Sequence, residues 1–211
     1  MLRCSKFNYF NAAFSLIEIL STLAIISILI GFSLPKFFAM QENARLSQAA
    51  DNVIDQIRLA RIEAATLNRP AAVVWIDQKN VDSNTHKRFI QIQRFIQSPY
   101  RKTQDDFSFI PMSKKITLPQ AILIHPEAEW SSLLQKRTSD VDYIEGIKGD
   151  YRMIIIYPSG RTSYDLYDSE GNPSEVFLTL VSEDELLLTK PKKIITITID
   201  PLTSVARQWR K

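Results

Sequence analysis

The sequence predicts an α+β protein in which one long N-terminal helix packs on a C-terminal antiparallel β domain. Residues 14–34 form an apolar run, and residues 41–67 carry an apolar stripe with helical spacing. After Pro70 the pattern changes to the alternating or β-branched runs that are typical of strands. A helix with one apolar stripe needs a surface to cover, so this order of elements favours a helix that lies on a sheet.

The apolar run from residue 14 to residue 34 contains Glu18 as its single charge. At ~1.5 Å per residue it spans about 30 Å, the thickness of a hydrocarbon core, so it predicts a transmembrane helix. Arg3 and Lys6 precede the run, which predicts a cytoplasmic N-terminus and an outer location for the rest of the chain. A carboxylate near the middle of a bilayer costs roughly 2.5–3.5 kcal/mol. Glu18 therefore needs a partner, and a free amine at Phe14 would supply one.

The second part of the predicted helix, residues 36–69, is amphipathic. Its apolar residues recur at three- and four-residue steps: Leu46, Ala50, Val53, Ile57, Ala60, Ala64 and Leu67. Charged residues fall mostly outside this stripe. Pro70 disfavours helical backbone at the residue before it, so we expect the helix to end at Asn68 or Arg69.

The remaining residues, 70–211, predict a β-rich domain. The candidate strands are residues 71–76, 88–96, 121–125, 152–157, 176–181 and 194–199. Turn-forming residues separate several of them, including the run from Pro158 to Gly160. The middle of the chain, from about residue 98 to residue 149, is polar and charged, and predicts long loops around short strands.

Composition limits the possible functions. The formal net charge is +3, and removal of residues 1–13, which contain Arg3, Lys6 and no acid, would lower it to +1. A nearly neutral domain does not indicate a nucleic-acid binder. The single cysteine, Cys4, lies in the same N-terminal stretch, so the rest of the chain has no thiol for disulfide or redox chemistry.

The run Ala13-Phe14-Ser15-Leu16-Ile17-Glu18, followed by apolar residues and then Pro35, resembles the class III signal of type IV pilins and pseudopilins. The resemblance implies that a prepilin peptidase cuts between Ala13 and Phe14 and methylates the new amine of Phe14. It also implies that Glu18 and Pro35, the fifth and twenty-second residues of the cut chain, serve assembly of a filament. The family normally has glycine before the cut, where this chain has Ala13.

The strand and turn around residues 156–161, with a late strand from Ile194, resemble the H-type minor pseudopilins of type II secretion and the FimT and FimU minor pilins. The resemblance implies the pilin fold, divided into a leader (1–13), a transmembrane and filament-core helix (14–35), its amphipathic continuation (36–69) and a periplasmic head (70–211). It implies a single-pass inner-membrane protein that joins a pseudopilus or pilus. The implied partners are the prepilin peptidase, other major and minor pseudopilins, the inner-membrane assembly platform and lipid.

We expect no enzyme activity, no cofactor and no metal. His86 and His125 lie far apart in the sequence and lack the spacing of zinc ligands. No phosphate-binding loop or nucleophile elbow is present in the sequence. Three acids, Asp165, Asp168 and Glu170, could share a calcium site, but their spacing is more typical of a solvated acidic turn.

The C-terminus is basic, with Arg207, Trp209, Arg210 and Lys211. Some FimT-like minor pilins bind DNA through a basic C-terminal Gly-Arg-x-Arg motif, whose glycine is missing here. The arginines and the lysine could contact phosphates while Trp209 stacks on a base. The alternative is a solvated tail with Trp209 packed on the sheet edge. The sequence thus leaves three hypotheses: a filament subunit, a minor pilin that binds DNA, and a membrane-anchored β domain with no filament role.

Overall fold

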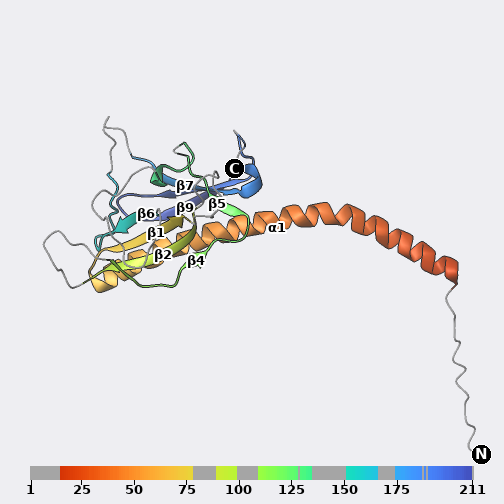
Figure 1. Ribbon diagram of the computed structural model, residues 1–211, viewed down its shortest axis with the longest axis horizontal. Helices are drawn as coiled ribbons and strands as arrows, with labels where there is room; N and C mark the ends of the chain where they lie inside the picture. The colour runs from red at the N-terminus through yellow and green to blue at the C-terminus, as the bar shows by residue number, and fades with distance from the viewer. Residues whose placement is uncertain are drawn as a thin grey trace, which may run out of the picture. The chain divides into compact units, whose positions relative to one another are not determined.

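The computed structural model describes residues 15–77, 89–98, 109–127, 129–134, 151–165, 174–186, 188 and 190–210, without the side chains of residues 32–36, 38, 39, 77, 89 and 90. These residues form one long helix and nine strands (Figure 1). In chain order the elements are α1 (Leu16–Leu67), β1 (Ala71–Asp77), β2 (Phe89–Gln97), β3 (Phe109–Pro111), β4 (Ile116–Thr117), β5 (Ile122–Ile124), the 3₁₀ turn η1 (Ser132–Leu134), β6 (Tyr151–Ile156), β7 (Val176–Ser182), the 3₁₀ turn η2 (Glu183–Glu185), β8 (Ile194–Ile199) and β9 (Ala206–Arg210). The predicted α+β class is confirmed.

The helix α1 crosses the boundary between two compact units, Met1–Gln41 and Glu42–Lys211. At its start, the amide of Glu18 donates to the carbonyl of Ser15 at 3.0 Å. At its end, Asn68 adopts φ 50° and the amide of Arg69 donates back to the carbonyl of Ala64 at 3.2 Å. Asparagine tolerates this left-handed conformation better than most residues, and the arrangement closes the helix where Pro70 predicted its end.

The strands form a single antiparallel sheet in the order β6-β1-β2-β5-β7-β8-β9, with β3 and β4 paired to β2. The strand β2 meets β1 along one edge, from Phe89 to Ile96, and β3, β4 and β5 in succession along the other. The pairing of β2 with β5 consists of Phe89 and Ile124 alone. A single residue pair therefore joins the β6-β1-β2 part of the sheet to the β5-β7-β8-β9 part.

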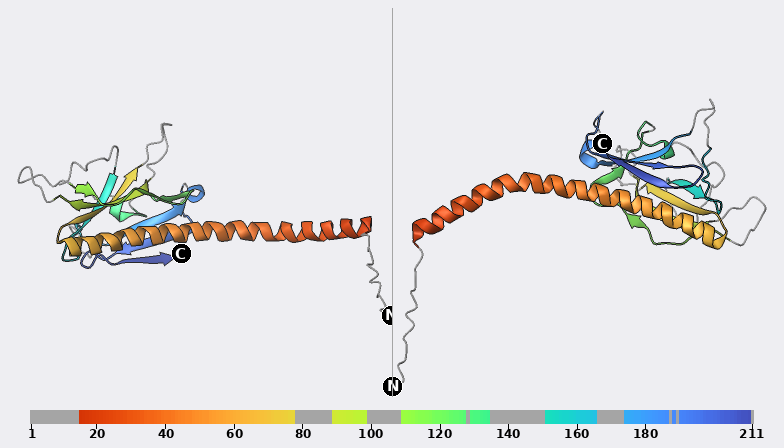
Figure 2. Two further views of the ribbon diagram at one scale, coloured as in Figure 1. Left: turned by 90° about the horizontal axis from the view of Figure 1, so that it is seen from below. Right: turned by 180° about the vertical axis from the view of Figure 1, so that it is seen from behind.

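The C-terminal half of α1, residues 42–67, lies along one face of this sheet (Figure 2). The predicted stripe residues Leu46, Ala50, Val53, Ile57, Ala60 and Ala64 are all buried in the core beneath the helix, and Ala49 joins them. Four of these positions are alanines with no exposed surface, namely Ala49, Ala50, Ala60 and Ala64. Small side chains therefore line much of the helix side of this contact. Leu67 was predicted to belong to the stripe but is 45% exposed, because the helix ends there, beyond the sheet contact.

A second apolar cluster lies on the opposite face of β1, β2, β3 and β6. Successive residues of a strand point to opposite faces, and in β1 both sets are buried: Val73 and Trp75 face α1, whereas Val74 and Ile76 face away from it. Phe95 of β2 joins the second set. The continuous apolar run of β1 thus reflects burial on both faces.

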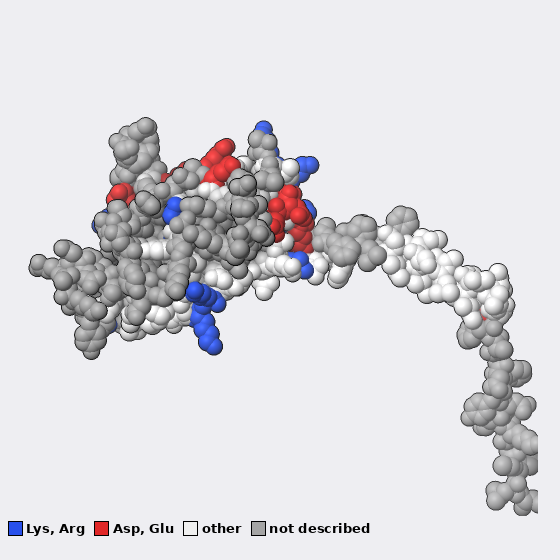
Figure 3. Space-filling view, viewed as in Figure 1, with Lys and Arg blue, Asp and Glu red and all other residues white. Residues whose placement is uncertain are grey.

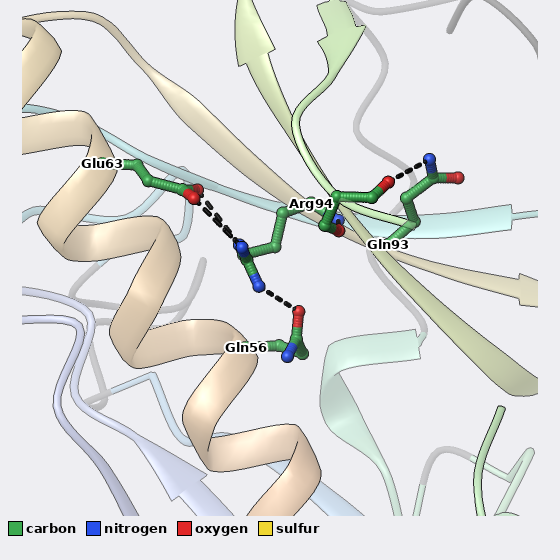
Figure 4. Close-up of polar contacts among 5 residues, drawn as sticks. Gln56, Glu63, Gln93 and Arg94 are labelled. Carbon is green, nitrogen blue, oxygen red and sulfur yellow. Dashed lines mark hydrogen bonds and ion pairs between the residues drawn. The ribbon is translucent and has the colours of Figure 1, made fainter. Parts of the chain in front are cut away.

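One polar cluster lies between α1 and the sheet. The guanidinium of Arg94, in β2, donates to the carboxylate of Glu63 from Nε and Nη2, both at 3.1 Å, and donates from Nη1 to the side-chain oxygen of Gln56 (Figure 4). The Arg94 side chain is only 12% exposed. A charge at this depth needs partners, and both partners come from α1, so the cluster fixes the helix in one register on the sheet.

The predicted strands agree with the observed ones to within one or two residues, and the prediction for residues 194–199 matches β8 in full. The predicted turn after β6 is present: the amide of Gly160 donates to the carbonyl of Tyr157 at 2.8 Å, and Gly160 adopts φ 87°. The strand β9 was not predicted, because its sequence has no apolar alternation.

Within the described residues, no helix combines the length and the apolar character that a membrane crossing requires. The transmembrane helix predicted over residues 14–34 is therefore not supported by the structure. Phe14 and the side chains of residues 32–34 lie outside the described part.

The alanine contact between α1 and the sheet gives a direct test. We expect Ala60→Leu to destabilise the protein by about 1–3 kcal/mol, because a fully packed contact cannot take the added atoms without strain. The matched control is Ala65→Leu, on the exposed side of the same helix, where the larger side chain meets solvent. Thermal unfolding of the full-length protein in detergent would measure both. Equal midpoints for the two variants would contradict close packing at Ala60.

Candidate assembly surface

The first half of α1 exposes an apolar surface with few charges. Ten large apolar side chains in this stretch are between 49% and 79% exposed: Leu16, Ile17, Ile19, Leu20, Leu23, Ile25, Ile26, Ile28, Leu29 and Ile30. Figure 3 shows the described residues of this part of the helix almost entirely without charge. Exposed apolar area of this extent marks a surface that is covered in the working state of a protein.

The polar side chains of this stretch are satisfied within the helix itself. Ser21 donates its hydroxyl to the carbonyl of Glu18 at 2.9 Å, Thr22 to that of Ile19 at 2.9 Å, and Ser27 to that of Leu23 at 2.8 Å. A hydroxyl that is already bonded to its own helix can enter an apolar environment at little cost. No role was predicted for these hydroxyls from the sequence, although serine and threonine inside an apolar run are visible in it.

Glu18 lies in the first turn of α1 and is exposed. A carboxylate near a helix N-terminus is favoured by the helix dipole. The surrounding residues Ile17, Ile19 and Leu20 offer it no charge partner. This single carboxylate, on a surface suited to apolar contact, would be stabilised by a cation from another molecule.

Three other residues were predicted to serve processing or assembly, namely Ala13, Phe14 and Pro35. Ala13 and Phe14 are outside the described residues, so the geometry of the predicted cleavage site is untested. The backbone of Pro35 is helical, and α1 continues through it, while its side chain is not described.

The basic C-terminal residues form the strand β9, which pairs with β8 as a hairpin. The register places Arg207 opposite Thr198 and Trp209 opposite Thr196, so Arg207 and Trp209 share one face of the sheet. The indole nitrogen of Trp209 donates to the Thr198 hydroxyl at 3.0 Å, which holds a ring that is 60% exposed. Arg210 pairs with Ile195 and belongs to the other face, the face that α1 covers elsewhere. The structure thus brings together Arg207 and Trp209 but not Arg210; Lys211 lies outside the described residues.

The described residues hold no group of three or more histidine, cysteine or acidic side chains that could bind a metal ion. His125 is buried after β5, beside the ring of Trp130 at 5.7 Å, and its Nδ1 accepts a bond from the amide of Glu127. Asp165 is exposed, while His86, Asp168 and Glu170 lie outside the described residues.

No family model and no curated protein matches this chain. Among solved structures, the minor pseudopilin EpsH from the type 2 secretion system of Vibrio cholerae superposes with a TM-score of 0.42 and 11% sequence identity, over 79% of this chain and 97% of that chain. A similarity of this size carries no argument about the function of this protein.

Asp200 organises the turn that joins β8 to β9. Its carboxylate accepts the amide of Leu202 at 2.9 Å and the hydroxyl of Thr203 at 2.8 Å, and its own amide donates to the carbonyl of Val205 at 3.0 Å. The bond from the Leu202 amide, followed by that from the Thr203 hydroxyl, lowers the pKa of the Asp200 carboxyl. The charged carboxylate therefore stabilises the hairpin that presents Arg207 and Trp209.

A lowered pKa gives the Asp200 contribution a definite pH dependence. It is fully present above about pH 3.9, the value of an unfolded aspartate, and is lost as the pH falls through the lower pKa of the folded state. We therefore expect Asp200→Asn to lower the unfolding midpoint at pH 7, and the gap from the native protein to close in acid. Asp55→Asn, at an exposed position of α1, is the control. A gap of constant size from pH 7 to acid would contradict this assignment.

Proposed function

We propose that this protein is a minor pseudopilin or minor pilin, a structural subunit that joins or initiates a short filament for protein secretion or a pilus. The observation that carries the proposal is the combination in one segment of the prepilin-like signal around Phe14 and Glu18 with the exposed, nearly uncharged first half of α1. A helix of this kind needs other helices or lipid around it, because water around so many leucine and isoleucine side chains is unfavourable.

The proposal gives each half of α1 a separate task. Residues 42–67 hold the β domain through a buried stripe on one side only. Residues 16–31 have exposed apolar side chains all around and hydroxyls bonded within the helix, so they can be surrounded by neighbouring subunits on every side. In this arrangement the Glu18 carboxylate pairs with the Phe14 amine of an adjacent subunit, which sets the axial step between the two helices.

The proposal includes an inner-membrane stage before assembly, with the β domain on the periplasmic side. Its support is sequence alone: the complete apolar run of residues 14–34 and the positive residues Arg3 and Lys6 before it. Extraction of cell membranes with alkaline carbonate would test it. A protein that leaves the membrane fraction with the peripheral proteins would exclude this stage.

The pairing of Glu18 yields a sharper test of the filament role. We expect Glu18→Leu to remain in the membrane fraction, since the change makes the segment more apolar, but to be lost from sheared filaments. The control is Ser21→Ala, one turn along the helix, which removes an internal hydroxyl bond and leaves the carboxylate in place. Immunoblots of membrane and filament fractions would measure both variants. Normal incorporation of Glu18→Leu would contradict the proposed pairing.

Deletion of the gene would identify the machine. Loss of a secreted protein would indicate a secretion pseudopilus, and loss of pili or of DNA uptake would indicate a pilus.

A further inference from the structure

Among the described residues, β9 forms one edge of the sheet. Within the described residues, β9 pairs with β8 on one side and with no strand on the other. In Figure 2, left, this strand lies at the border of the sheet. At the opposite end of the sheet, β6 is partly covered, because Ser163 donates its amide to the carbonyl of Ile155 at 2.8 Å and Ile156 forms a bridge with Thr162. The edge of β9 is therefore the freer one for a further strand.

The turn at Asp200 shows which backbone groups of β9 point to the open edge. The amide of Asp200 donates to the carbonyl of Val205, so this carbonyl faces β8, whereas the amide of Val205 donates to the Thr203 hydroxyl at 3.4 Å. Backbone groups alternate in direction along a strand, so those of Arg207 and Trp209 also face β8. The amides and carbonyls of Ala206, Gln208 and Arg210 then point away from the sheet. An added strand would find three residues with unpaired backbone groups in regular spacing.

The side chains of β9 indicate the charge of the added strand. Arg207, Gln208, Trp209 and Arg210 are exposed, and in the described part of the chain neither arginine forms an ion pair with a carboxylate. Asp200, in the turn before β9, already accepts two hydrogen bonds, and Arg207 makes the smallest contribution to lowering the pKa of its carboxyl. One arginine lies on each face of the strand, so an added strand would meet a positive charge on both of its faces.

We propose that the edge of β9 binds an extended acidic segment of another protein, which adds to the sheet as a further strand. The backbone groups of Ala206, Gln208 and Arg210 supply the ladder bonds, Arg207 and Arg210 attract the carboxylates, and Trp209 gives a fixed aromatic surface for an apolar side chain. Nucleic acid fits less well, because the two arginines lie on opposite faces and a phosphate backbone has no ladder to pair. A second copy would bring four arginines together along one edge, which charge repulsion opposes.

The test uses the full-length protein in a non-ionic detergent. The probe is a capped eight-residue peptide of two Glu-Glu-Val-Val repeats, which places glutamates on both faces of an added strand, and a peptide of two Lys-Lys-Val-Val repeats is the comparison. Hydrogen exchange of the fragment that contains residues 206–210 is followed by mass spectrometry. We expect the acidic peptide to slow the exchange of the outward amides about tenfold, as for an amide that enters a strand ladder, and the basic peptide to leave it unchanged.

Two variants at one position separate backbone pairing from side-chain contact. Gln208→Pro removes an amide that points outward and leaves the ladder to β8 intact, whereas Gln208→Ala keeps the amide. Protection should be lost in Gln208→Pro, with an unfolding midpoint close to that of the native protein, and kept in Gln208→Ala. The double change Arg207→Gln and Arg210→Gln should weaken the binding of the acidic peptide and remove the salt dependence of that binding.

Each other outcome would overturn the proposal in a defined way. Equal protection in Gln208→Pro and the native protein would show that the peptide does not add as a strand. Protection of the same fragment by a single-stranded DNA oligonucleotide, but not by the acidic peptide, would assign the edge to nucleic acid. Slow exchange without any peptide, together with a dimeric mass, would assign it to a second copy of the chain.

Discussion

The packing of α1 on the sheet, in one apolar cluster, is the interaction on which the rest of the structure depends. Four alanines with no exposed surface line the helix side of the contact, together with the larger buried side chains of Leu46, Val53 and Ile57. Polar side chains add to the contact: Arg94 of β2 bonds to Glu63 and Gln56 of α1, and Lys193, just before β8, pairs with Glu42 of α1. Close packing and a buried charge together allow one position of residues 42–67 on the sheet.

This contact also explains the difference between the two halves of α1. In residues 42–67 the buried apolar side chains lie on the side that the sheet covers, while Leu59 and Ile62 are exposed. In residues 16–31 the apolar side chains are exposed all around, and the hydroxyls of Ser21, Thr22 and Ser27 turn back onto the helix. The first half is therefore built for surroundings that the isolated chain does not provide, and a filament of similar helices would provide them.

Much of the fold could be predicted from the sequence, for identifiable reasons. The stripe from Leu46 to Ala64 and the alternation of β8 depend on a periodicity that a single sequence displays. The strand β9 could not be predicted, because its residues are mostly polar and β8 alone holds it in the sheet. The role of Arg94 was equally hidden, since its partners lie 31 and 38 residues earlier in the chain.

The candidate site was predicted in part. Glu18 stood out because it is the single charge in an apolar run, and the structure exposes it at the start of α1. The basic C-terminus was predicted as one group, but pairing with β8 puts Arg207 and Arg210 on opposite faces. Sequence spacing could not show this division without the knowledge that residues 206–210 form a strand.

The central claim is that the chain is a processed filament subunit, and the intact mass of the protein tests it most directly. The protein would be purified from cells with and without an active prepilin peptidase. The account predicts a peptidase-dependent loss of residues 1–13 and one added methyl group on Phe14. An uncut chain in both cells would contradict it, and would indicate a membrane-anchored β domain with a different role.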